Sequence, residues 1–273
     1  SLSGIRFINL RNHRKILCVD GKVAYVGGIN INKNNLVNSS RHPIDDIHFK
    51  VTGPVINQIS QVFIEDWFYA THENIDFPAY KSKPKDPTVH ASVTARVIQD
   101  GPDQNYDKIR WTLINALACA QSSVKIMTPY FIPDNSLMTA LHAAALRGIL
   151  IEIIIPKRSN IPFLDWAIDA NIPRIMTHGI RVYRNQRPFD HSKIALIDDI
   201  WSFVGSTNWD ARSLELNFEI NLECYDAALN TELTQFFMLK KKNATLVDKE
   251  HIEALPFLKR IRNNFARLFT PYL

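Results

Sequence analysis

Two histidine–lysine pairs in this sequence have matching surroundings. The first pair is His13 with Lys15 and the second is His191 with Lys193, a separation of 178 positions in both cases (191 − 13 and 193 − 15). An imidazole can attack an electrophile or move a proton near neutral pH, and an ammonium group can neutralise phosphate oxygens. The two pairs therefore indicate nucleophilic and acid–base chemistry on a phosphoryl group.

The match extends to further positions at the same spacing. A lone histidine at the start of a strand is most often a surface or core residue, and a lone lysine there is usually solvated. Chance agreement of several residue types at a fixed spacing is improbable, so the repeat favours a functional interpretation. The other equivalent positions are Asp20 and Asp198, Gly27 and Gly205, Gly28 and Ser206, and Asn30 and Asn208.

Each copy of the repeat predicts a strand, a tight turn and a second strand. The first strands are expected at KILCVD and KIALID, which begin with the lysine of each pair. Because side chains alternate along a strand, the histidine two positions earlier would point the same way as that lysine. We interpret Asp20 and Asp198 as structural residues of the motif, because an aspartate at a turn bonds the nearby backbone.

The return strand of each copy ends in small residues, in GGIN at 27–30 and GSTN at 205–208. Small residues let backbone N–H groups approach an anion, and an asparagine amide adds a donor. We therefore predict that Gly28, Ser206, Asn30 and Asn208 bind a phosphate group of the substrate.

Each imidazole also needs an acceptor for its second ring nitrogen. After the second motif, Glu215, Asn217 and Glu219 alternate as on one face of a strand, and we select Glu219. After the first motif we select Asp46, although a solvated charge at the start of a strand explains that residue equally well.

Composition is that of an ordinary globular protein, with 273 residues, 46% of them hydrophobic and 22% charged. The longest apolar run, 149–156, is much shorter than the roughly 20 residues of a membrane-spanning helix, and the first residues do not form a signal peptide. Three cysteines without a CxxC pair do not favour a disulfide framework or a zinc site. The net charge of +5 suggests nucleic acid, anionic lipid or a phosphorylated substrate as a partner.

The repeat divides the chain into a first half, 1–75, a Pro- and Lys-rich linker, 76–92, and a second half, 93–273. Counterparts of the earliest elements of the second half would lie before Ser1, so we expect the first half to be truncated. The alternation of helices and strands predicts an α/β layered fold. The elements expected in the second half are helices over 106–120, 135–147 and 163–178 and strands over 124–128, 149–155 and 181–184.

The motif HxKxxxxD followed by GGxN or GSxN, twice in one chain, resembles the phospholipase D superfamily. Nearly the whole chain takes part in a closer similarity to bacterial cardiolipin synthases. The segments that carry it are GPD at 101–103, TPYFIPD at 128–134, RSLELNFE at 212–219, DDIHFKVTGP at 45–54 and LFTPYL at 268–273.

The resemblance implies a fold of two halves related by a pseudo-twofold axis, each a mixed β-sheet flanked by helices, with one active site between them. It implies that His13 attacks the phosphorus to form a phosphohistidine, while His191 is the general acid and base. Lys15, Lys193 and the two asparagines would neutralise the phosphoryl oxygens. Asp46 would orient His13 and Glu219 would orient His191, and the mechanism needs no metal or cofactor.

The resemblance further implies a phosphatidyltransferase that makes cardiolipin from two phosphatidylglycerol molecules and releases glycerol. The alternative is a phosphodiesterase that hydrolyses phospholipid or nucleic acid, and a non-catalytic lipid-binding chain is a third class. Nucleic acid is not favoured, because no stretch interleaves aromatic with basic residues. We expect action at a membrane surface, the bacterial inner (cytoplasmic) membrane, with anchoring by a region absent from this chain.

The C-terminal segment 255–273 has an apolar helical face beside basic residues. This pattern fits a helix that lies on anionic lipid, and it fits equally well a helix that packs on its own domain. The sequence does not predict the oligomeric state or the preferred acceptor.

Overall fold

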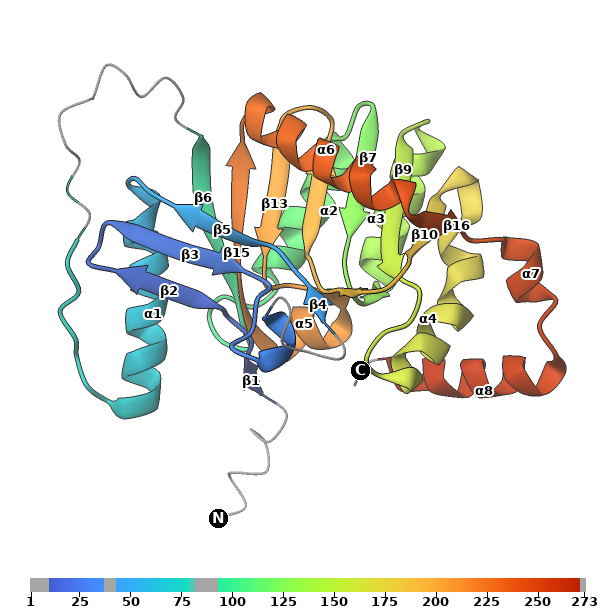
Figure 1. The fold of residues 1–273 in the computed structure, drawn as a ribbon, viewed down its shortest axis with the longest axis horizontal. Coiled ribbons are helices and arrows are strands. Elements are labelled where there is room, and N and C mark those ends of the chain that lie inside the picture. Colours follow the sequence, from blue (N-terminus) through green and yellow to red (C-terminus); the bar gives the residue numbers. More distant parts are fainter. Residues whose placement is uncertain (1–9, 37–42, 80, 82–92, 271–273) are drawn as a thin grey trace, which may run out of the picture.

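A computed structural model describes residues 10–36, 43–79, 81 and 93–270 as one α/β molecule (Figure 1). Its helices are η2 (Lys33–Asn35), α1 (Val55–Thr71), α2 (Lys108–Cys119), α3 (Asn135–Leu146), α4 (Pro162–Ile175), η3 (Thr177–Gly179), α5 (Ala211–Glu215), α6 (Ala227–Lys242), α7 (Lys249–Glu253) and α8 (Phe257–Leu268). Its strands are β1 (Arg11–Asn12), β2 (Ile16–Val19), β3 (Val23–Gly27), β4 (Ile44–Asp45), β5 (His48–Val51), β6 (Thr94–Asp100), β7 (Ser123–Met127), β8 (Phe131–Ile132), β9 (Leu150–Pro156), β10 (Arg181–Asn185), β11 (Phe189–Asp190), β12 (Ile194–Ile197), β13 (Trp201–Gly205), β14 (Trp209–Asp210), β15 (Asn217–Tyr225) and β16 (Ala244–Leu246).

The largest sheet is mixed and has the order β1-β15-β13-β12-β7-β9-β10-β16, with β6 beside β15. Strands β7, β9 and β10 run parallel to one another, and the pairs β7–β12, β12–β13 and β13–β15 are antiparallel. Helices α2, α3 and α4 pack on one face of the sheet, and α6 packs on the other together with α1 (Figure 1). The predicted α/β class, with mixed sheet flanked by helices, is confirmed.

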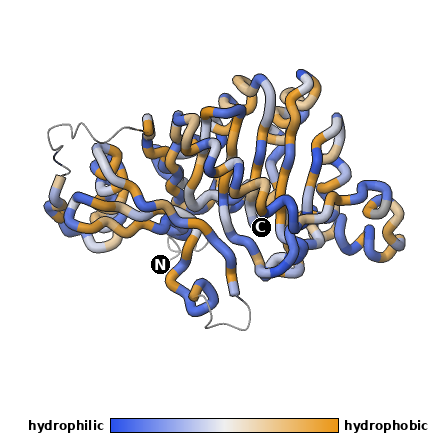
Figure 2. The backbone as a smooth tube through the Cα atoms, turned by 45° about the horizontal axis from the view of Figure 1, so that its top comes forward, coloured by the Kyte–Doolittle hydropathy of each residue, from blue (hydrophilic) through white to orange (hydrophobic). Residues whose placement is uncertain are grey.

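Strand β9 shows why the central strands of this sheet have sequences with consecutive apolar residues. Ile153 and Ile155 belong to the core on the side of α2 to α4, whereas Ile154 belongs to the core on the side of α1 and α6. A strand covered by helices on both faces needs apolar residues at consecutive positions. Figure 2 shows the same feature as hydrophobic colour along the central strands.

The first half contributes a smaller antiparallel sheet, β2-β3-β5, and helix α1. Strands β2 and β3 are the counterparts, at the spacing of 178, of β12 and β13, and β5 with α1 corresponds in order to β15 with α6. Ala24, Val26 and Ile56 share one hydrophobic cluster with Ile194 and Leu196, so the two halves are joined by a common core. Most of the predicted linker, 80 and 82–92, lies outside the described residues.

Two short parallel pairings also cross between the halves near the repeated motif. Strand β1 of the first half pairs with the start of β15, in the register Arg11–Asn217. Strand β11 of the second half pairs with β4, in the register Asp190–Asp45. Each stretch that precedes a motif histidine is therefore fixed to the opposite half.

The motif aspartates lie at the two turns, where Asp20 and Asp198 have positive φ values of 52° and 53°. Asp198 also accepts hydrogen bonds from the backbone N–H groups of Gln121, Ser122 and Ser123. Burial disfavours its charged form, but these hydrogen bonds prevail and lower its pKa. Asp198 thus fixes the start of β7 to the hairpin that carries the second motif.

Candidate active site

Each motif histidine is hydrogen-bonded to a carboxylate from the opposite half of the chain. His13 Nδ1 lies 2.9 and 3.0 Å from the two carboxylate oxygens of Glu219. His191 Nδ1 lies 2.8 Å from Oδ2 of Asp46. The predicted pairing, His13 with Asp46 and His191 with Glu219, is therefore wrong, although the four residues are those selected from the sequence.

The two strand pairings that cross between the halves explain why each histidine bonds to the carboxylate of the other half. The backbone N–H of His13 donates to the carbonyl oxygen of Phe218 at 2.9 Å, next to Glu219. The backbone N–H of His191 donates to the carbonyl oxygen of Asp45 at 2.7 Å, next to Asp46. These hydrogen bonds hold residues 13–15 and 191–193 in irregular segments before β2 and β12, so the histidines and lysines do not lie within strands as predicted.

Both carboxylates are buried, with side-chain exposures of 0% for Glu219 and 1% for Asp46. A buried carboxylate is tolerated only when its oxygens have partners. Glu219 accepts hydrogen bonds from the Ser206 hydroxyl and, at 3.2 Å, from the Asn217 amide, in addition to His13. With Nδ1 bonded to a carboxylate, Nε2 of each imidazole is the nitrogen left to act on a substrate.

The small residues after β3 and β13 make room for these carboxylates and do not offer backbone donors to an anion. The N–H of Gly28 donates to the Ile47 carbonyl oxygen at 3.1 Å, and that of Ser206 to the Ile220 carbonyl oxygen at 2.9 Å. A Cβ at Gly28 would lie 2.2 Å from Oδ1 of Asp46. The predicted role of the Gly28 and Ser206 N–H groups in phosphate binding is therefore corrected, because both already pair within the protein.

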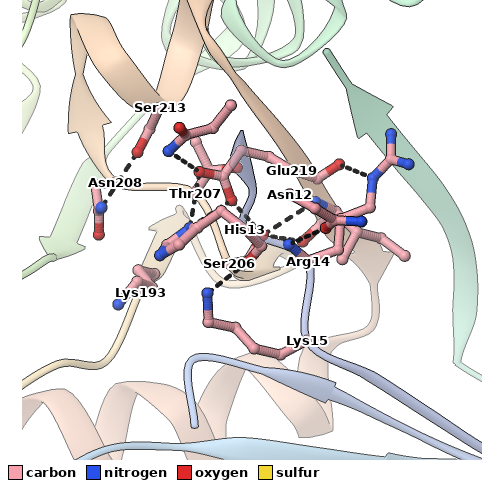
Figure 3. Close-up of polar contacts among 12 residues, drawn as sticks. Asn12, His13, Arg14, Lys15, Lys193, Ser206, Thr207, Asn208, Ser213 and Glu219 are labelled. Atoms are coloured by element: carbon pink, nitrogen blue, oxygen red, sulfur yellow. Dashed lines mark hydrogen bonds and ion pairs between the residues drawn. The ribbon is translucent and has the colours of Figure 1, made fainter. Parts of the chain in front are cut away.

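The two motif lysines interact with both carboxylates, which shows that the repeats meet in one site. Lys15 Nζ donates to the carbonyl oxygen of His13, and Lys193 Nζ to that of His191. Burial lowers the pKa of Lys15 to about 8 and that of Lys193 to about 7, opposed in both cases by the charges of Glu219 and Asp46. Figure 3 shows Lys15 and Lys193 gathered with His13, Ser206 and Glu219.

The environment of His191 favours its neutral form. Burial, and next the charge of Lys193, lower the pKa of His191 to about 4 in spite of the hydrogen bond to Asp46. An anion between the two lysines would offset their charges and raise the pKa of His191 again. The ionisation of this imidazole is thus coupled to the presence of a phosphate.

The two motif asparagines occupy different environments. Asn208 is buried, donates to the Ser213 hydroxyl at 3.2 Å, and retains a second amide proton for an anion. Asn30 is exposed in the loop between β3 and η2. The difference arises because α5 follows and covers the second motif, whereas η2 follows the first.

Two aromatic residues near His191 were not selected from the sequence. The ring centroid of Phe189 lies 5.9 Å from that of His191, and the ring of Tyr130 lies 6.5 Å away, edge-on. Phe189 directly precedes the motif and Tyr130 lies within TPYFIPD, so both were visible as neighbours of quoted segments. Among the described residues, no group of three or more His, Cys, Asp or Glu side chains is arranged to hold a metal ion.

We predict that Lys193→Met stabilises the protein by roughly 1–3 kcal/mol at pH 7 while it abolishes turnover. The unfolded chain keeps the Lys193 proton up to its ordinary pKa of 10.5, whereas the folded protein releases it above about pH 7, so wild-type stability rises with pH in that window. Denaturant unfolding should therefore show that the free energy of unfolding of the variant exceeds that of the unmodified protein at pH 7, and that this difference shrinks toward pH 10.

Lys240→Met is the matched control, because Lys240 is a half-buried lysine of α6 that is paired with Asp45 and Asp190. Its loss should lower stability. A destabilised Lys193→Met protein at pH 7 would contradict the argument from burial.

The chain is similar in sequence to known proteins. Residues 113–240 match the sequence profile of the family described as "Cardiolipin synthase, PLD-like domain". The chain is 33% identical over 267 residues to "Cardiolipin synthase" of Geobacillus kaustophilus, a match that covers 97% of this chain and 53% of that protein. It is also 33% identical over 266 residues to "Cardiolipin synthase 1" of Staphylococcus epidermidis, with coverages of 97% and 54%. The chain thus spans about half the length of the curated relatives it matches.

Among solved structures, the fold is similar to phosphatidylserine synthase of Haemophilus influenzae, with a TM-score of 0.72 and 16% identity. That match covers 96% of this chain and 70% of the other. A more distant similarity is to polyphosphate kinase of Porphyromonas gingivalis, with a TM-score of 0.57, 16% identity, and coverages of 88% and 35%. At these identities the likeness concerns the fold alone. Residues 113–240 thus match a PLD-like domain of the cardiolipin synthase type, and nearly the whole chain is similar to part of the cardiolipin synthases.

Proposed function

We propose that this protein transfers a phosphatidyl group from one phosphatidylglycerol molecule to another, forming cardiolipin and releasing glycerol. The observation that carries the proposal is the crossed pair of carboxylate-bound imidazoles, together with two lysines that interact with both carboxylates. Two imidazoles can act on opposite sides of one phosphorus atom, and two ammonium groups can neutralise its oxygens. The similarity to proteins named cardiolipin synthases supports the choice of lipid.

In the first step, Nε2 of His13 attacks the phosphorus of the donor lipid. The bond from phosphorus to the glycerol oxygen breaks, and His191 gives its proton to that oxygen, so that glycerol leaves and a phosphohistidine remains. In the second step, the hydroxyl of the acceptor lipid loses its proton to His191 while its oxygen attacks the phosphorus. The phosphorus–nitrogen bond to His13 breaks, and both imidazoles return to their starting states.

The burial of His191 suits its proposed role as the base of the second step, because the neutral imidazole accepts a proton. For the first step it must be protonated, and the negative charge of the bound phosphodiester favours that form. Lys15, Lys193 and the second amide proton of Asn208 would hold the phosphoryl oxygens as charge spreads over them. Water in place of the acceptor would convert transfer into hydrolysis.

We predict that His13→Gln and His191→Gln each lower the rate of cardiolipin formation by at least about 100-fold. The assay measures cardiolipin and free glycerol after the protein is incubated with phosphatidylglycerol vesicles. His178→Asn is the matched control, since this exposed histidine lies in η3, before β10, at the end of the sheet opposite to the motif.

Phosphatidic acid as the sole lipid product would favour a phospholipase, and cleavage of DNA without a lipid product would favour a nuclease. Either result would contradict the proposed transfer. Full activity of the His191→Gln variant would contradict the single site built from both motifs.

We further propose that the protein meets an anionic bilayer through helix α8. This helix packs on α4, where Asn263 and Ala266 are buried and the Arg262 guanidinium lies 4.4 Å from the Trp166 ring centroid. Its other face leaves apolar side chains uncovered. The most exposed are Phe257 at 73%, Leu258 at 78% and Leu268 at 71%.

The position of α8 supports this proposal. In Figure 1, α8 and the C-terminal end of α1 lie along the lower edge of the molecule, as does β1, which leads into the first motif. Ile31 beside η2 and Tyr69 near the end of α1 are also exposed. Exposed apolar residues with basic neighbours such as Lys259 and Arg260 are typical of surfaces that lie on anionic lipid. No helix of the described residues is long and apolar enough to cross a membrane.

We predict that replacing Phe257, Leu258 and Leu268 together by serine weakens binding to phosphatidylglycerol vesicles at least about tenfold, because each side chain loses its transfer into the interface. Vesicle sedimentation measures the effect. Leu239→Ser on α6 is the control, since Leu239 is 57% exposed but α6 packs on the opposite face of the sheet from α4, the helix that carries α8. Unchanged sedimentation of the triple variant would contradict a membrane role for α8.

A further inference from the structure

A basic cavity of about 470 Å³ lies at the carboxyl ends of β9 and β10. Lys157 and Arg158 follow β9, and Gln186 and Arg187 follow β10. The two strands are parallel neighbours in the register Pro156–Asn185, so their following loops emerge at the same edge of the sheet. The carboxyl edge of parallel strands is where α/β proteins commonly bind ligands.

The three cations of this basic cavity have no acidic partner. No carboxylate lines the cavity, and within the described chain no carboxylate pairs with Lys157, Arg158 or Arg187. Among the residues that the structure describes, Lys157 Nζ has one polar contact, with Oε1 of Gln186 at 3.4 Å. By contrast, the neighbouring Arg184 is paired with Asp169. Three like charges around one concave surface repel each other, and a bound anion would relieve that repulsion.

The basic cavity and the active site share a wall. Phe189 lines the cavity, and its ring centroid is 5.9 Å from that of His191. Phe189 and Asp190 form β11, which leads directly from the cavity loop into the motif. A ligand in the cavity is therefore separated from the proposed general acid and base by about one aromatic ring.

We propose that this cavity binds the phosphate group of the acceptor lipid while the terminal hydroxyl of that lipid reaches His191. The inference rests on the proposed transfer reaction and identifies the second of its two lipid sites. In phosphatidylglycerol a three-carbon glycerol unit joins the phosphate to the hydroxyl that attacks, so the two groups must bind close together. Arginine binds phosphate oxygens in a bidentate manner, which suits Arg158 and Arg187 to this ligand.

The donor phosphate does not account for the basic cavity. Lys15 and Lys193 each donate to the carbonyl oxygen of their motif histidine and interact with both carboxylates, so they can serve the reacting phosphate. A reaction that joins two phosphate-bearing lipids needs a second cationic site, and that site must lie on the side of the base that activates the acceptor. The cavity meets both requirements, and it would favour an anionic acceptor over glycerol or water.

The test compares two acceptors with the same donor. The full protein and a variant with Lys157→Gln, Arg158→Gln and Arg187→Gln are given phosphatidylglycerol vesicles with labelled glycerol. Cardiolipin formation reports transfer to an anionic lipid, and label in phosphatidylglycerol reports transfer to a neutral alcohol. We expect the variant to lose cardiolipin formation at least about tenfold, through a higher KM for the acceptor, and to keep glycerol exchange within about twofold.

Arg181→Gln is the matched control, because Arg181 is an exposed arginine at the opposite end of β10. Equal loss of both reactions, or loss of neither, would overturn the assignment of the cavity to the acceptor. If the unmodified protein shows neither cardiolipin formation nor exchange, the proposed transfer itself fails, and this outcome is distinct from a failure of the cavity.

A second measurement distinguishes a lipid headgroup from free phosphate. Calorimetry with inorganic phosphate should give two sites per chain in the unmodified protein and one in the triple variant, since the lysines of the motif are untouched. The triple variant could lose one phosphate site without any change in the ratio of cardiolipin formation to glycerol exchange. That result would show a site for free phosphate and would overturn the acceptor role. An unchanged number of phosphate sites would overturn the cavity as an anion site.

Discussion

The site depends on two buried carboxylates that each hold an imidazole from the other half of the chain. Glu219 is bonded to His13, and Asp46 to His191, through strand pairings that cross between the repeats. A buried carboxylate without a partner is costly, so each half stabilises a charge that the other half supplies. Neither repeat contains a complete imidazole–carboxylate pair by itself, so the proposed site needs both copies of the motif.

The same arrangement sets the charge of the site. Burial lowers the pKa of the partly buried Lys15 and of the buried Lys193, and it lowers the pKa of His191 to about 4. An anion between them would restore the lysine charges, which is the behaviour expected of a phosphate site. The basic cavity beside Phe189 and the exposed apolar face of α8 suit the proposed substrate, which carries a phosphate at one end and acyl chains at the other.

Periodicity and spacing were sufficient to predict three helices and three strands of the second half, the duplicated motif and the four side chains that form the two imidazole–carboxylate pairs. They could not predict which carboxylate meets which histidine, because that depends on β1 and β11, strands of two residues with no pattern of their own. The N–H groups of Gly28 and Ser206 seemed available for phosphate only because their carbonyl partners come from distant strands. The basic cavity was equally hidden, since Lys157 and Arg187 are brought together only by the register of β9 and β10.

The pairing of each motif histidine with a carboxylate from the other half can be tested directly by 15N NMR of the histidine side chains. The Nδ1 and Nε2 signals of His13 and His191 would be recorded in the unmodified protein and in the variants Asp46→Asn and Glu219→Gln. The structure predicts that Asp46→Asn shifts the signals of His191 and leaves those of His13 in place, and that Glu219→Gln does the reverse. A shift of His13 alone in the Asp46→Asn protein would contradict the crossed pairing and the single site that rests on it.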